Sequence, residues 1–189
     1  MIEDSLFLRN DSLDKKIIVT CSSKPNAELK VSELTHFDTG KGGKQYQFST
    51  LAQSREELGV ESFKCLSNNP MNNDFICSSG LIHNSSDDAP THQESGVLIW
   101  KIDQSILGHE DDQAKKGGPN KRVKPNSTII SPNAKIPCSG GISTMKWSGP
   151  TKIFAGCYDH SLKLINVDRL QIEEVLFTSH KVPTCIDST

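Results

Sequence analysis

The feature that most constrains the fold is a pair of strands that recurs three times along the chain. In each copy an apolar strand ends in a cysteine and small residues, a polar turn follows, and a second strand alternates apolar and polar residues. Alternation at a period of two marks a strand with one buried face. The copies lie at 17–34, 74–102 and 152–167, where the cysteine strands read IIVTCSS, DFICSSG and KIFAGCYD. This repeat predicts an all-β chain built from similar antiparallel units.

A further series of strands supplies the spacing of these units. It reads VESFKCLS from Val60, ISTMKWS from Ile142 and VPTCIDS from Val182. Ile142 and Val182 are 40 residues apart, which matches the ~40–45 residues of a four-stranded propeller blade. The longer interval after Val60 holds two stretches without strand patterning, 81–95 and 104–126, which are predicted to be disordered loop insertions. Two ordinary blades in that interval are the alternative, although no second small-residue strand with an alternating partner is found there.

The repeat also decides how Tyr158, Asp159 and His160 are interpreted. These residue types could form an active-site loop, but they lie between a cysteine strand and an alternating strand, where a tight turn is expected. Asp159 would stabilise that turn by accepting hydrogen bonds from nearby backbone N–H groups. His160 then lies in the turn rather than in a catalytic dyad. Tyr158, just before the turn, is expected at the rim, where an aromatic side chain can bind a partner.

The element AGCYDHSLKLIN (155–166) resembles the ending of a WD repeat, which reads small-Gly-Ser-x-Asp-x-Thr-hydrophobic-Lys-hydrophobic-Trp-Asp. Trp100 supplies the Trp form in the preceding unit. The match departs at Cys157, Ile165 and Asn166, which stand in place of Ser or Thr, Trp and Asp. The resemblance implies an incomplete WD40-type β-propeller of about three four-stranded blades. It also implies that the hydrogen-bond network of Asp, His, Ser and Trp is incomplete in the last of them, so that packing must hold that blade together.

The predicted blades divide the chain at about 1–56, 57–137 and 138–179, with the start of another at 180–189. A propeller hides its strand edges by closing a ring, typically of about 4–8 blades, and an open arc leaves those edges unpaired. We therefore expect the sequence to be a fragment of a longer protein. A break in the gene model, completion by a partner chain and self-association into a ring are the alternatives.

From about 96 to 189 the order of elements is similar to that of the WD-repeat subunit of the nucleolar pescadillo–block-of-proliferation complex. A strand ending in LIW is followed by a long acidic-then-basic loop, and then by a degenerate blade with Trp147 and the YDH turn. The resemblance implies a non-catalytic interaction scaffold for pre-rRNA processing and pre-60S assembly, in the nucleolus or nucleoplasm, with partners from a ribosome assembly complex. The sequence shows no counterpart of the family's N-terminal ubiquitin-like domain, so contact with a remodelling ATPase is not implied. A WD-repeat adaptor in a ubiquitin ligase or chromatin complex is the alternative function, and a propeller-framed enzyme is a third.

Four residues near strand starts are predicted to contact a partner at the rim, because the loops between strands share one face of a propeller. They are Glu61, Ser143, Tyr158 and Lys181.

The loop KKGGPNKRVK carries five basic residues and is interpreted as a nuclear import signal or a loose contact to the phosphates of pre-ribosomal RNA. A solvated loop is the alternative, and the lack of an interleaved aromatic residue gives no support for base stacking. The five basic residues are Lys115, Lys116, Lys121, Arg122 and Lys124.

Composition and charge exclude several classes of protein. The formal net charge of −2 over 189 residues provides no general field for nucleic acid or acidic lipid. No apolar run reaches the ~20 residues of a membrane helix, and the first residues lack the pattern of a secretory signal. Six cysteines without a CxxC pair indicate buried structural thiols rather than a zinc site or a disulfide framework. We expect no catalytic site, metal, cofactor or small-molecule substrate.

Overall fold

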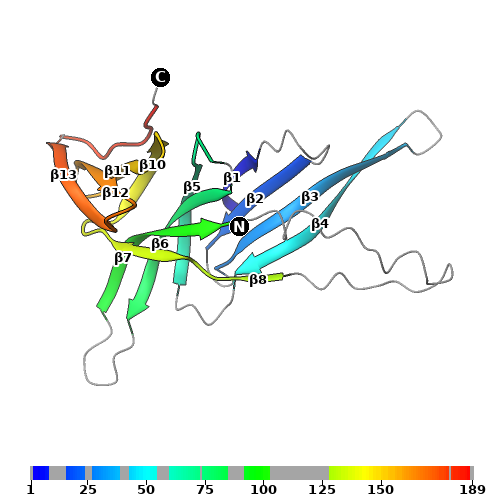
Figure 1. Ribbon diagram of the computed structural model, residues 1–189, viewed down its shortest axis with the longest axis horizontal. Helices are drawn as coiled ribbons and strands as arrows, with labels where there is room; N and C mark the ends of the chain where they lie inside the picture. The colour runs from blue at the N-terminus through cyan, green and yellow to red at the C-terminus, as the bar shows by residue number, and fades with distance from the viewer. Residues whose placement is uncertain are drawn as a thin grey trace.

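The computed structural model of the chain describes residues 2–8, 16–23, 27–38, 43–54, 60–72, 74–84, 92–102, 128–178 and 180–187. All regular elements in these segments are β-strands, and they form three sheets that follow one another across Figure 1. The all-β prediction is therefore confirmed for the described residues. In these segments there is no helix of the length and apolarity needed to cross a membrane.

The first sheet is an antiparallel meander of four strands with a fifth strand at one edge. The meander runs through β1 (Ile2–Leu8), β2 (Lys16–Ser22), β3 (Leu29–Asp38) and β4 (Lys44–Ser54). The fifth strand, β8 (Thr128–Ile130), lies parallel to β4. The sequence had placed 128–130 in the second unit, whereas the structure pairs it with the first sheet. Its Ile130 is buried in the core of that sheet, and this burial holds the short strand at the edge.

The middle and third sheets each contain four strands in antiparallel order. The middle sheet consists of β5 (Val60–Asn68), β6 (Phe75–Asn84), β7 (His92–Lys101) and β9 (Ala134–Pro137). The third consists of β10 (Ile142–Ser148), β11 (Lys152–Cys157), β12 (Ser161–Asn166) and β13 (Gln171–Thr178). Apart from β8, the strands of each sheet fall within one of the three predicted sequence ranges. The cysteine strands β2, β6 and β11 are each the second strand of a different sheet, as the repeat predicts.

Two stretches depart from the sequence-based expectations. Residues 81–84 and 92–95, expected in a loop insertion, instead extend β6 and β7, with pairs from Leu81↔Ser95 to Asn84↔His92. Polar composition suggested a loop there, but a ladder of backbone hydrogen bonds continues regardless of side-chain polarity where both strands are already aligned. Residues 182–187, expected to begin another strand, form no strand, and Pro183 among them lacks the backbone N–H that a ladder needs. The remaining residues of the two predicted insertions, 85–91 and 104–126, lie outside the described segments.

The first strands of the three sheets, β1, β5 and β10, pack next to one another, with β5 in the centre. Polar contacts join them as well as apolar ones. The backbone N of Leu66 in β5 donates to Asp4 Oδ2 of β1 at 2.8 Å, and the backbone N of Trp147 in β10 donates to Ser67 Oγ of β5 at 2.9 Å. The sheets are therefore held together along their first strands.

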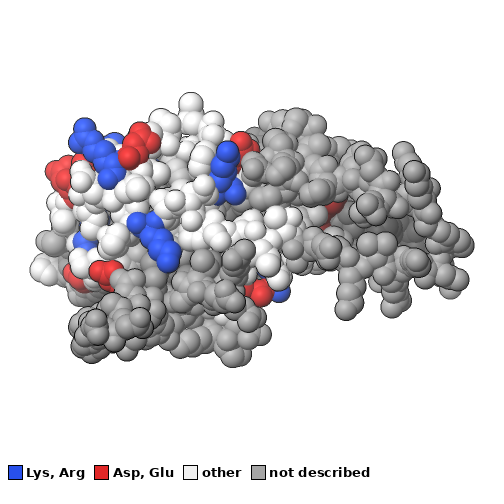
Figure 2. Space-filling model, turned by 60° about the horizontal axis from the view of Figure 1, so that its bottom comes forward, with Lys and Arg blue, Asp and Glu red and all other residues white. Residues whose placement is uncertain are grey.

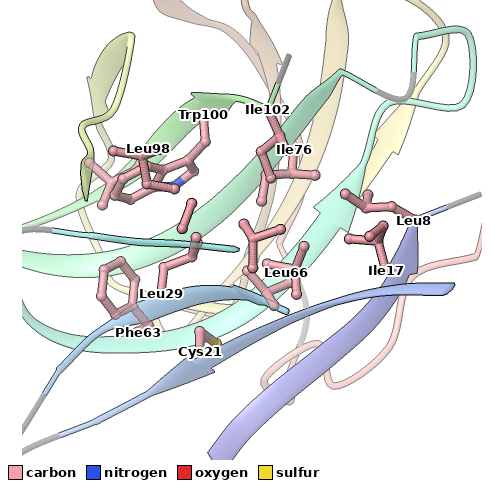
Figure 3. Packing of buried hydrophobic residues seen from close by; sticks show 14 residues of the cluster. Leu8, Ile17, Cys21, Leu29, Phe63, Leu66, Ile76, Leu98, Trp100 and Ile102 are labelled. Atoms are coloured by element: carbon pink, nitrogen blue, oxygen red, sulfur yellow. The ribbon is translucent and has the colours of Figure 1, made fainter. Parts of the chain in front are cut away.

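The middle sheet is buried on both faces, because one apolar core lies on each side of it. One core joins it to the first sheet and includes Trp100 and Leu98, while the other joins it to the third sheet and includes Val97 and Ile99. Figure 3 shows the first core, where Leu98 and Trp100 point toward Leu29 of the first sheet. Residues 96–100 of β7 are consequently all buried, and this strand reads as a continuous apolar run rather than an alternation.

Equivalent positions of the middle and third sheets face in the same direction. Trp100 pairs with Ile76 between β7 and β6, and Ile165 pairs with Ile153 between β12 and β11. Trp100 and Ile76 face the core toward the first sheet, whereas Ile165 and Ile153 face the core toward the middle sheet. The middle and third sheets thus present the same face to the sheet before them. Two sheets of a sandwich would instead bring their corresponding apolar faces together.

A buried hydrogen bond accompanies Trp100 in the middle sheet. Its Nε1 donates to Ser78 Oγ at 2.8 Å, and neither side chain is exposed. Ser78 lies two residues after Ile76, and the residue two positions after the equivalent Ile153 is Ala155. Ala155 therefore occupies the position of Ser78 in the third sheet. Both partners of the bond are therefore apolar in the third sheet, with Ile165 in place of Trp100. By the same alignment the cysteines are not equivalent, because Cys77 corresponds to Phe154 rather than to Cys157.

Candidate functional site

The turn between β11 and β12 is organised by the carboxylate of Asp159. Its Oδ1 accepts hydrogen bonds from the backbone N of Ser161 at 3.0 Å and from the Ser161 hydroxyl at 2.5 Å. The backbone N of His160 donates to the carbonyl of Cys157 at 3.1 Å, and His160 takes a left-handed backbone conformation with φ of 68°. Asp159 and His160 both lie in the turn, where the sequence placed them.

Lys163 directs its ammonium group into the same turn. Its side chain is 5% exposed, and Nζ donates to Asp159 Oδ2 at 2.9 Å and to the carbonyl of Ser139 at 2.5 Å. Burial lowers the pKa of Lys163, but the hydrogen bond to Asp159 and the attraction of the nearby negative groups together outweigh it and leave the pKa raised. Burial likewise raises the pKa of Asp159, but hydrogen bonds from Ser161 and Lys163 leave it lowered. The charged pair ties the turn to the link that follows β9.

That link approaches the turn closely because it contains two glycines. Gly140 has φ of +89°, and a Cβ there would lie 2.2 Å from Asp159 Oδ2. Gly141 has φ of +66°, and its carbonyl accepts a hydrogen bond from the backbone N of Tyr158 at 3.0 Å. The two glycines of CSGG (138–141) therefore allow the link to pack closely against the turn.

Tyr158 is the exposed aromatic residue of this region. Its side chain is 49% exposed, and the Nζ of Lys64 from β5 lies 5.8 Å from the centroid of its ring. This distance is within the range of a cation–π interaction. The contact reaches from the middle sheet to the third, so Tyr158 marks the junction of the two.

A groove of about 260 Å³ lies at this junction. Lys64 and Leu81 line it from the middle sheet, and Ile142 and Tyr158 line it from the third. Ser62 also lines the groove, and its Oγ is buried without a hydrogen-bond partner among the described residues. The groove therefore combines apolar walls with an aromatic ring and an ammonium group, which are groups that bind side chains of a partner.

The other predicted rim residues take different positions. Ser143 lies in β10, and its hydroxyl points to the carbonyl oxygens of Gly156 at 2.9 Å and Pro183 at 2.6 Å, so its hydrogen-bonding capacity is used within the chain. Lys181 is exposed in the segment after β13. Glu61 lies in β5, and its side chain is outside the described part of the structure. Of the predicted rim residues with described side chains, Tyr158 lines the groove and the others do not.

The five predicted basic residues lie outside the described segments. They are Lys115, Lys116, Lys121, Arg122 and Lys124. On the face shown in Figure 2, the described Lys and Arg side chains are interspersed with Asp and Glu. That face therefore presents no patch of one sign among the residues that the structure describes.

Sequence reasoning missed Lys64 and the serines of the groove. Phe63 is fully buried and Lys64 is exposed, so the alternation of VESFKCLS indicates that Lys64 points outward. The pattern cannot indicate that Tyr158, 94 positions later in the chain, lies beside it. The described residues include no group of three or more His, Cys, Asp or Glu side chains that could hold a metal ion.

Comparison of the sequence with protein-family models and with curated proteins gives no significant match. The function therefore has to be inferred from the groove and from the arrangement of the sheets.

Proposed function

We propose that the chain is a non-catalytic scaffold of the WD-repeat propeller type, which binds a partner protein through the groove beside Tyr158. Within this proposal the partner belongs to a complex that processes pre-rRNA and assembles the large ribosomal subunit in the nucleolus or nucleoplasm.

The direction of stacking supports the propeller. In a propeller every four-stranded sheet packs the same face on its predecessor, and the first strands gather around one axis. Two observations support this arrangement: Trp100 and Ile165 each face the preceding sheet, and β5 packs between β1 and β10. The Ser78–Trp100 hydrogen bond agrees with the WD-type pattern of the middle unit.

The groove is the observation that carries the docking function. It opens where two sheets meet, at the end of the sheets that holds the β11–β12 turn, and it is lined by an exposed tyrosine. Tyrosine is enriched at the energetic centres of protein–protein interfaces. Because Lys64 lies against the ring of Tyr158, the side chain has a support that limits the entropy lost on binding.

The role in ribosome assembly is supported by the order of sequence elements from 96 to 189, including the acidic-then-basic loop, which is similar to that of the ribosome-assembly family. In this proposal the loop acts as an import signal or as a loose contact to pre-ribosomal RNA.

The test is affinity purification of the tagged chain from cells, with wild type compared to Tyr158→Ala and Tyr46→Ala. Tyr46 is a matched control, because it is 59% exposed on the first sheet and is the other tyrosine of the chain. We expect Tyr158→Ala to lower partner recovery at least tenfold, a loss of about 1.4 kcal/mol or more, while Tyr46→Ala leaves recovery unchanged. Melting temperatures of both variants should stay near that of wild type.

Equal losses of recovery for Tyr158→Ala and Tyr46→Ala would contradict docking at the groove. The identity of the recovered proteins tests the process separately. Pre-60S proteins are expected, whereas a cullin or histone complex would remove the ribosome-assembly part of the proposal and leave the scaffold.

A further inference from the structure

Two cysteine thiols meet at the junction of the middle and third sheets. Cys138 directly follows β9, and Cys157 is the last residue of β11. Their Sγ atoms lie 3.8 Å apart, and neither side chain is exposed. A disulfide needs a sulfur separation of about 2 Å, so the two atoms must approach each other by roughly 1.8 Å to form the bond.

The electrostatic surroundings of this pair differ from those of other buried cysteines in the chain. Burial raises the pKa of Cys65 to about 11 and that of Cys21 to about 12. In contrast, the two thiols share a hydrogen bond that either sulfur can donate; with Cys138 as the donor it lowers the pKa of Cys157 to about 7, and the nearby ammonium group of Lys163 favours the thiolate of both residues. The same hydrogen bond raises the pKa of Cys138. Because the thiolate is the reactive form of cysteine, Cys157 is suited to be the nucleophile and Cys138 the resolving thiol.

We propose that Cys138 and Cys157 are a redox-active pair, which hydrogen peroxide converts to a disulfide that joins the middle and third sheets. The Cys157 thiolate attacks one peroxide oxygen, the O–O bond breaks, and the departing hydroxide takes a proton to become water. The product is a sulfenic acid on Cys157. The Cys138 sulfur then loses its proton and attacks Cys157 Sγ, the S–O bond breaks, and the second oxygen leaves as water. Two thiols thus supply the two electrons that reduce one peroxide to two water molecules.

Because both thiols are fully buried, a small oxidant can reach the pair only when the turn and link that cover it open locally. Tyr158, the residue after Cys157, is half-exposed at the groove, and the link at 139–141 after Cys138 contains the exposed Gly140. Local opening of this turn and link uncovers both sulfur atoms, and peroxide is close to water in size. Since opening must come first, the pair should react more slowly than an exposed thiol such as Cys185.

The disulfide also has a structural consequence for the groove. It would fix the link that contains Gly141 against the strand that leads into Tyr158, and both of these residues line the groove. Oxidation therefore stiffens one wall of the groove and ties β9 to β11.

The test uses the purified wild-type chain in its reduced form. After treatment with hydrogen peroxide, the chain is unfolded, alkylated with iodoacetamide and digested for mass spectrometry. We expect a cross-linked peptide pair through Cys138 and Cys157, lighter than the two reduced peptides together by two hydrogen atoms. Dithiothreitol should remove the cross-link. Cys77 is the matched control, because it is equally buried but contacts the sulfur of Met145 at 3.7 Å, and it should remain fully alkylated.

A second variant separates the two steps. With Cys138→Ser the reaction should stop at the sulfenic acid on Cys157, which dimedone traps. The proposal is overturned if Cys138 and Cys157 are still alkylated as completely as Cys77 after peroxide treatment is prolonged well beyond the complete oxidation of Cys185. Disulfides that join either residue to another cysteine would also overturn it. The cross-link map of the wild-type chain decides the question even where the variant fails to fold.

Discussion

Replacing Ser78 by alanine should destabilise the chain by about 1–3 kcal/mol, because the indole N–H of Trp100 would then be buried without an acceptor. The native bond is 2.8 Å long, and both side chains are fully buried, so water cannot replace the lost hydroxyl without a rearrangement of the core. Trp100→Phe should also lower the free energy of unfolding, since it removes packing and leaves the Ser78 hydroxyl buried without a partner. The Ser78→Ala/Trp100→Phe double variant removes both polar groups, so neither is left buried without a partner. Its cost should therefore fall below the sum of the single costs by about 1–3 kcal/mol.

Trp147 provides the matched control for this cycle. It is buried to nearly the same extent as Trp100, but its Nε1 has no hydrogen-bond partner in the part of the chain that the structure describes. Trp147→Phe removes the same atoms without breaking a bond, so it should cost about 1–3 kcal/mol less than Trp100→Phe. The assay is equilibrium unfolding in urea followed by far-ultraviolet circular dichroism, which does not depend on either tryptophan as a probe. Strict additivity in the cycle, or equal costs for Trp100→Phe and Trp147→Phe, would refute the reasoning.

Two further predictions concern the link and the turn beside the groove, and Gly149 in the β10–β11 turn serves as the control for the first. Gly149→Ala should cost only the strain of a positive φ, about 1–2 kcal/mol, because no atom lies within 4 Å of the added Cβ. Gly140→Ala should cost more in urea unfolding, since its Cβ would collide with the Asp159 carboxylate, and equal costs would contradict the contact. The lowered pKa of Asp159 means that its stabilising contribution is present above its ordinary value of 3.8 and is lost as the pH falls through the folded-state pKa. Unfolding free energies measured from pH 5 downward should therefore fall more steeply for wild type than for Asp159→Asn, and parallel curves would count against the Asp159–Lys163 pair.

The division into three sheets could be predicted because it depends on short-range patterns. The alternation in SLKLINV and the small-residue cysteine strands correctly indicate strands, although in β12 the buried face carries Ser161, Lys163 and Ile165 rather than the two leucines. The turn residue Asp159 reflects hydrogen bonds to Ser161, two positions away. The groove could not be predicted in this way. It depends on Lys64 of one sheet meeting Tyr158 of the next, and the spacing of residues along the chain carries no information about the angle between two sheets.

The parallel pairing of β8 with β4 could not be predicted from the sequence pattern either. Three residues are too few to show a period, and Thr128–Ile130 reads equally well as the end of a loop. Its place is decided by the burial of Ile130 in the first core, which is a property of the assembled sheets. The polar ends of β6 and β7 illustrate the opposite error, because composition there indicates a loop while the backbone ladder continues to Asn84 and His92.

In the third sheet Ile165 stands at the position of Trp100, which looks like a defect in the sequence alone, but the strand register changes that interpretation. A lone Trp→Ile replacement would leave the serine hydroxyl of the preceding strand buried without a partner, at a cost of about 1–3 kcal/mol. The register places Ala155 at the position of that serine, opposite the strand that carries Ile165, and both residues are fully buried. Replacing both members of a hydrogen bond by apolar groups can be nearly neutral. The third sheet should therefore owe its stability to apolar packing against the middle sheet, with no penalty from the missing bond.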